Sequence, residues 1–191
     1  MSKTLKRQRR HELAKYQRAY EAANYKMKSE RRQDAVNDIA ALPIRGALLD
    51  VGCGRGEMLA EAEDLGFSPV QGTETVPALI DGQRVVAARV DALPFPDKAF
   101  DVTTMFDVIE HLIPGDDERA CRELARVAKH HIVLTANNKR SRNKAGDELH
   151  INRRPYDEWD RLFRKWFEGH AVTWIKGERH YISEAWRIDL A

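Results

Sequence analysis

Three glycines at alternate positions stand where an apolar segment ends and a helical pattern begins. The segment LLDVGCGRGEML places Gly52, Gly54 and Gly56 directly after Asp50. Glycine tolerates positive φ and lets a ligand approach the bare main chain, so this spacing predicts a turn that holds a nucleotide-like ligand. A dinucleotide site has the spacing G-x-G-x-x-G, whereas Glu57 follows the third glycine here. Because the Asp50 carboxylate would repel a pyrophosphate and attract an ammonium group, the turn favours a cationic ligand without phosphate.

Three further segments follow the glycine turn in the order of a doubly wound α/β sheet. Glu74 ends a second strand-like segment, at about the position of a ribose-binding carboxylate. DALPFPDKAFDV over 91–102 and MFDVIEHL over 105–112 come next. The four segments lie within about residues 46–136, and together they resemble the motifs of class I S-adenosylmethionine (SAM) dependent methyltransferases, type 11-like. The resemblance implies a Rossmann-like α/β fold: a seven-stranded, mostly parallel sheet with helices on both faces and a C-terminal antiparallel hairpin.

The resemblance also implies which residues hold SAM, the methyl donor. Asp50 would support the amino-acid end of the donor, and Glu74 would bind both ribose hydroxyls because a carboxylate offers two acceptors to a vicinal diol. Asp91 would accept from the adenine amino group, and the Ala92 amide would donate to the ring. Phe106 would lie beside the methionine part. The complete donor site implied in this way is Asp50, Gly52, Cys53, Gly54, Gly56, Glu74, Thr75, Asp91, Ala92 and Phe106.

Two histidines are the candidates for chemistry on the methyl acceptor. His111 follows the strand that carries Phe106, and His150 lies in a loop beyond the next strand. Both therefore converge at the carboxyl edge of the sheet, where ligands bind in open α/β folds. An imidazole there can take the acceptor's proton near neutral pH. For His111, a purely structural role at the start of a helix is given the same weight as this chemical role.

A divalent cation is a less favoured addition to this site. Asp107, Glu110, His111 and His150 resemble the E-x-x-E-H motif and distal histidine of metal-using methyltransferases. Such a set can bind Mg²⁺ or Mn²⁺ and polarise a hydroxyl. Aspartate stands at the first position here, and its shorter reach argues against a full ligand set.

Length and composition predict one protein domain. The 191 residues are 42% hydrophobic, which is enough for a single core and leaves no room for a second catalytic domain. Cys53 and Cys121 are far apart and form neither a disulfide framework nor a metal-ligand pattern. No apolar run approaches the roughly 20 residues of a membrane helix, and no signal-like segment follows the N-terminus. We therefore expect a soluble, cytoplasmic protein with no membrane partner.

The net charge is only +2, but the basic residues form two clusters. One lies at the N-terminus and the other after the predicted fifth strand; they comprise Lys3, Lys6, Arg7, Arg9 and Arg10, and Lys139, Arg140, Arg142 and Lys144. The first cluster is interpreted as a solvated helix face, with contact to nucleic acid as the alternative. For the second cluster, a site for an anionic substrate and a solvated loop are equally favoured interpretations.

Apolar spacing predicts the elements that position these residues. Residues 1–44 form a helical arm or cap in which Tyr20, Tyr25 and Met27 close over the donor, and residues 45–191 form the SAM-binding domain. Strands are predicted over 46–51, 69–74, 85–90, 101–107, 131–135, 171–175 and 184–190, and helices over 5–42, 56–66, 116–130 and from Pro155 onward.

Three functions follow, in ranked order. The first is O- or N-methylation of a small, anionic acceptor. The second is methylation of a nucleic acid such as RNA through the basic arm and loop. The third is a SAM-binding protein without catalytic activity, which the intact glycine turn and Glu74 argue against.

Overall fold

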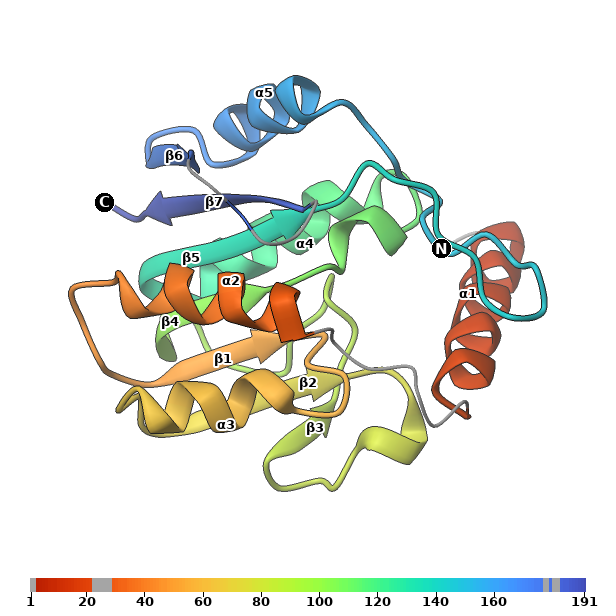
Figure 1. Cartoon of the computed structure of the whole chain (residues 1–191), viewed down its shortest axis with the longest axis horizontal. Coiled ribbons are helices and arrows are strands. Elements are labelled where there is room, and N and C mark those ends of the chain that lie inside the picture. Colours follow the sequence, from red (N-terminus) through yellow and green to blue (C-terminus); the bar gives the residue numbers. More distant parts are fainter. Residues whose placement is uncertain (1–2, 22–28, 177–178, 180–182) are drawn as a thin grey trace.

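The computed structural model describes residues 3–21, 29–176, 179 and 183–191. Its described strands form one seven-stranded sheet in the order β3-β2-β1-β4-β5-β7-β6 (Figure 1). The first five strands are parallel, and β7 runs antiparallel to both β5 and β6. This arrangement confirms the predicted fold class. The strands are β1 Leu48–Val51, β2 Val70–Glu74, β3 Val85–Ala87, β4 Phe100–Met105, β5 Ala128–Ala136, β6 Ala171–Ile175 and β7 Glu184–Asp189.

Alternating side chains on the central strands build an apolar core on each face of the sheet. Leu48 and Val133 pack on the face covered by α2 and α3. Leu49 and Leu134, their immediate neighbours, pack on the opposite face, which α4 and α5 cover (Figure 1). The helices are α1 Lys3–Glu21, α2 Ser29–Ala40, α3 Glu57–Asp64, α4 Asp116–Val127 and α5 Tyr156–Trp166, with short 3-10 turns η1 Pro77–Leu79 and η2 Ile109–His111.

The end of one predicted helix lies in a strand. The helix expected over 116–130 ends at Val127, and Lys129 lies in β5. Its ammonium pairs with Asp101 of β4 at 3.2 Å, across neighbouring strands. Pairing with β4 therefore decides the conformation here, and the last residues of the predicted helix belong to a strand.

The described part of the N-terminal arm contains two helices, which differ in how they attach. Ala35 and Ile39 of α2 are buried in the core. No described residue of α1 belongs to an apolar core cluster, and α1 lies beyond the carboxyl ends of the parallel strands (Figure 1). Tyr25 and Met27, which we expected to close over the donor, lie outside the described residues. None of the described helices combines the length and hydropathy that crossing a bilayer requires.

Candidate functional site

A cavity of about 820 Å³ lies at the carboxyl edge of the sheet, between the strand ends and α1. Its volume is in the range of sites for small ligands, roughly 300–1,000 Å³. The position is the one expected for an open α/β sheet, since β1 and β4 flank the point where the strand order reverses. Six of the predicted site residues line the cavity: Gly52, Glu74, Thr75, Ala92, Asp107 and His111.

The glycine turn requires glycine for both conformation and space. Gly52 has a φ of 78°, and a Cβ there would lie 2.6 Å from Cγ2 of Val108. Gly54 has a φ of 56°, and a Cβ there would lie 2.7 Å from the hydroxyl of Tyr20. Any other residue would therefore be strained and would displace a neighbour at the cavity.

Glu74 joins the end of β2 to the glycine turn. Its Oε1 accepts hydrogen bonds from the amides of Thr75, at 2.6 Å, and Val76, at 3.1 Å. Its Oε2 accepts from the Gly54 amide at 3.1 Å. A carboxylate has about four acceptor positions, so Oε2 retains capacity for a ligand hydroxyl on the cavity side.

Asp50 supports the turn from within the sheet and does not line the cavity. Its Oδ1 accepts a 2.6 Å hydrogen bond from the Thr104 hydroxyl. Burial raises the pKa of Asp50 to about 7, the nearby Glu74 carboxylate adds to this shift, and the Thr104 hydrogen bond opposes it. A cation bound at the turn would therefore favour loss of the Asp50 proton.

This shift predicts that the ligand-free protein loses stability as the pH rises. In the unfolded chain Asp50 loses its proton near pH 4, whereas the folded protein keeps it up to about pH 7. The folded state thus binds more protons in this window, so its free energy of unfolding falls from about pH 4 to about pH 7, by about 1.4 kcal/mol per pH unit at most. Denaturant unfolding of Asp50→Asn across this range should lack that decline, whereas Asp97→Asn, at an exposed position, should retain it. Parallel curves for wild type and Asp50→Asn would contradict the assignment.

Two predicted donor residues pack behind the turn. Cys53 lies with Leu59 and Val85 in a small apolar cluster, and burial raises the pKa of its thiol. Phe106 is buried in the core beside Met58. The structure therefore assigns these two side chains to packing, and neither lines the cavity.

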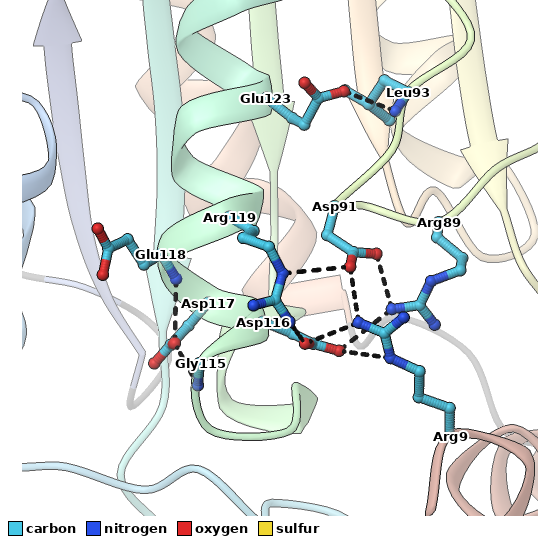
Figure 2. A network of polar contacts seen from close by, with 10 residues as sticks. All are labelled: Arg9, Arg89, Asp91, Leu93, Gly115, Asp116, Asp117, Glu118, Arg119 and Glu123. Carbon is cyan, nitrogen blue, oxygen red and sulfur yellow. Dashed lines mark hydrogen bonds and ion pairs between the residues drawn. The ribbon is translucent and has the colours of Figure 1, made fainter. Parts of the chain in front are cut away.

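Asp91 is held by arginines. Figure 2 shows its carboxylate between the guanidinium groups of Arg9, at 2.8 Å, and Arg89, at 2.6 Å. Arg9 also pairs with Asp116, so α1 is tied to both acids. Burial acts to raise the pKa of Asp91, but Arg89 and Arg9 outweigh it and hold that pKa below its usual value. Ala92 lines the cavity and Asp91 does not.

The two candidate histidines lie together. Their rings meet edge to face, with centroids 4.6 Å apart; His150 is buried and His111 is half-buried. Burial lowers the pKa of His111 to about 3, with His150 adding to the effect. Burial also lowers the pKa of His150, whose Nδ1 lies 2.7 Å from the carbonyl of Lys139. Both imidazoles are therefore neutral at physiological pH, and His111 lines the cavity.

Glu110 completes a cluster of three side chains that could bind a metal. One ligand atom from each of Glu110, His111 and His150 lies within 4.8 Å of the others. Glu110 is fully buried, and no described N–H group donates to its carboxylate. Burial and the neighbouring Asp107 raise its pKa well above the usual range. Asp107 is not part of the cluster, because its carboxylate pairs with Arg31 at 2.6 Å and accepts from Ser183 at 2.7 Å.

Sequence reasoning missed Arg9, Tyr16 and Asp116 as parts of the site. The Tyr16 hydroxyl is hydrogen-bonded to Nδ1 of His111 and donates to the Leu149 carbonyl at 3.1 Å. From the sequence, Arg9 is interpreted as part of a solvated helix face or a nucleic-acid contact, and no site role is assigned to Tyr16 or Asp116. No local signal predicts these contacts, since each joins segments far apart in the chain.

Comparison with known proteins is consistent with this geometry. A family model described as a methyltransferase domain matches residues 49–134. The PH0226 protein of Pyrococcus horikoshii is 19% identical, with a TM-score of 0.66 over 86% of this chain and 92% of that one. The 1,6-didemethyltoxoflavin-N1-methyltransferase of Burkholderia thailandensis, solved with 1,6-didemethyltoxoflavin and S-adenosylhomocysteine, is 18% identical, with a TM-score of 0.67 over 85% and 79%.

A third solved structure is the methyltransferase domain of bacterial CtHen1-CN. It is 18% identical, with a TM-score of 0.64 over 84% of this chain and 98% of that one. At these identities the three structures establish a shared fold. No curated protein sequence matches the chain.

Proposed function

We propose that this chain, whose residues 49–134 match a methyltransferase domain, is a SAM-dependent methyltransferase that methylates an oxygen or nitrogen atom of a small, anionic acceptor. The observation that carries the proposal is a single cavity in which donor and acceptor residues meet. Gly52 and Glu74 line this cavity, and the Glu74 carboxylate retains the acceptor capacity that ribose hydroxyls need. His111 also lines the cavity and is available as a neutral base.

The chain's residues supply positioning and proton transfer. When bound, SAM provides an electrophilic methyl group on a sulfonium. Glu74 and the glycine turn orient the donor, and such alignment can supply up to roughly 7–11 kcal/mol of barrier reduction. His111 accepts the proton of the acceptor. A weak base is sufficient for a hydroxyl acceptor, because the proton becomes strongly acidic as its oxygen gains the methyl group.

Two features support a small anionic acceptor over RNA. The cavity lies under α1, which limits the space for a polymer, and Lys6 and Arg10 line it without an acidic partner among the described residues. In the basic loop after β5, Arg140 and Arg142 both lie near Glu148, at 3.1 and 3.8 Å, which reduces the charge available to a polyanion. The donor-binding cap at residues 1–44 is part of this proposal, with α1 as its covering element.

Metal-assisted transfer is the second candidate. Glu110 is a buried carboxylate without an N–H donor, beside two neutral imidazoles. This donor set suits a divalent cation. Glu110, His111 and His150 would then hold the ion, which would polarise an acceptor hydroxyl.

The proposal is tested with methyl-labelled SAM and two acceptor pools. Calorimetry should first show one S-adenosylhomocysteine (SAH) molecule bound per chain. Label should then pass to a component of an anionic metabolite pool. Transfer to an RNA pool instead, declining steeply with added salt, would support the nucleic-acid alternative, and failure to bind SAH or SAM would contradict the donor site.

A further inference from the structure

Helix α1 covers the donor cavity but is held in place by polar contacts. Arg9, Tyr16 and Tyr20 line the cavity opposite Gly52 and Glu74. A donor bound at the glycine turn would therefore lie beneath α1. With α1 seated, its residues line one side of the cavity and would hinder the entry of SAM and the release of SAH.

The polar contacts of α1 extend along its length. Arg9 pairs with the domain at one end, and Arg18 pairs with Asp147 at 2.9 Å near the other. Between them, Lys15 donates to the Glu148 carbonyl at 2.9 Å. The exposed pair of Arg18 and Asp147 contributes little net stability, because water replaces such contacts when they open. No described residue of α1 belongs to the apolar clusters, so lifting α1 would expose less of the core than lifting α2 would.

The ion pairs that Arg9 forms are more buried than the pair of Arg18 with Asp147, which also seats α1. The Arg9 guanidinium donates to Oδ1 and Oδ2 of Asp116, at 2.8 and 3.1 Å, and to Oδ2 of Asp91, at 2.8 Å (Figure 2). The three side chains are only 14%, 4% and 7% exposed for Arg9, Asp116 and Asp91. Arg9 therefore bridges two buried acids from separate parts of the domain, the loop after β3 and the start of α4.

Two other arginines keep both acids paired when Arg9 departs. Arg89 pairs with Asp91 at 2.6 Å and with Asp116 at 3.1 Å. Arg119 also contacts both carboxylates (Figure 2). Breaking a buried ion pair is costly chiefly because it leaves one charge uncompensated. Since Arg89 and Arg119 belong to the domain itself, lifting α1 avoids most of that cost.

We propose that Arg9 is a donor-positioning residue: its clamp on Asp91 and Asp116 seats α1 over bound SAM and sets how fast SAH leaves. The inference rests on the proposed donor site but not on the identity of the acceptor. It also gives Asp91 an indirect role, in which that residue anchors the cover of the cavity instead of meeting the donor.

The test is the dissociation rate of SAH from the full chain, measured by stopped-flow displacement with excess SAM. Arg9→Gln should release SAH about tenfold faster or more, because charge-assisted hydrogen bonds are lost. Arg7→Gln, an exposed position on the same helix, should match wild type. In a double-mutant cycle, Asp116→Asn should add little to Arg9→Gln, since both remove the same clamp. Equal SAH dissociation rates for Arg9→Gln and wild type would overturn the proposal.

Hydrogen exchange of the wild-type chain provides a second readout that needs no variant. Amides of α1 should exchange faster than those of α2 without ligand, and SAH should slow α1 selectively. If α1 exchanges as slowly as α2 with and without SAH, then α1 is a fixed part of the domain and the proposal fails. If SAH does not bind at all, the donor site itself is wrong, so the two failures are distinguishable.

Discussion

Replacing His111 with alanine is expected to lower the rate of methyl transfer by about a hundredfold or more, with little change in SAM affinity. The reason is that His111 meets the acceptor side of the cavity, whereas Glu74 and the glycine turn hold the donor. Its interaction strengthens in the transition state, so the loss should appear in turnover and not in donor binding. Labelled-SAM turnover and SAH calorimetry on the same samples separate the two quantities. His130→Ala, at an exposed position in β5, is the matched control.

The pH profile and a chelator separate the two roles of His111. Sequence alone suggested a titration near pH 6–7, but burial lowers the pKa of His111 to about 3. The neutral, active form therefore persists from pH 5 to 8, and activity that depends on it declines only as the pH falls toward about 3. Chelator-insensitive activity with this flat profile supports proton transfer. Activity lost to a chelator and restored by Mg²⁺ or Mn²⁺ supports the metal, in which case His150→Ala should be as damaging as His111→Ala. Full activity of His111→Ala would contradict both roles.

Replacing Glu74 with alanine is expected to weaken SAH binding by about 1–3 kcal/mol, or roughly 5- to 150-fold. The change removes the acceptor for the ribose hydroxyls and also leaves the amides of Gly54, Thr75 and Val76 without their partner. The glycine turn should therefore loosen as well, which lowers the stability of the ligand-free protein. Calorimetry with SAH and thermal unfolding measure the two effects.

Two further variants sharpen this experiment. Glu74→Gln keeps one oxygen for the Thr75 and Val76 amides but loses the acceptor for Gly54, so its affinity should lie between those of wild type and Glu74→Ala. Glu63→Ala removes a half-exposed carboxylate of α3 that does not line the cavity and should bind SAH normally. Wild-type affinity in Glu74→Ala would exclude Glu74 from the donor site.

Sequence alone determined the features that depend on neighbouring residues. The alternation of apolar residues predicted most strands, and the spacing of Gly52, Gly54 and Gly56 predicted a turn with positive φ, which all three adopt. The position of Glu74 at the end of β2 placed it at the cavity. These features are local, because the period of a strand and the conformational freedom of glycine do not require distant contacts.

Only the tertiary structure decided which charges meet and which groups lose their water. The hydrogen bonds of Arg9 to Asp91 and Asp116 span 82 and 107 residues, beyond the reach of any local pattern. Asp91, which we expected to bind adenine, is thereby paired with Arg9 of α1. His111 and Glu110 titrate far from their usual ranges because folding buries them beside His150 and Asp107. Desolvation and long-range ion pairing arise only when the chain is packed, which is why motif spacing located the site but its electrostatics required the fold.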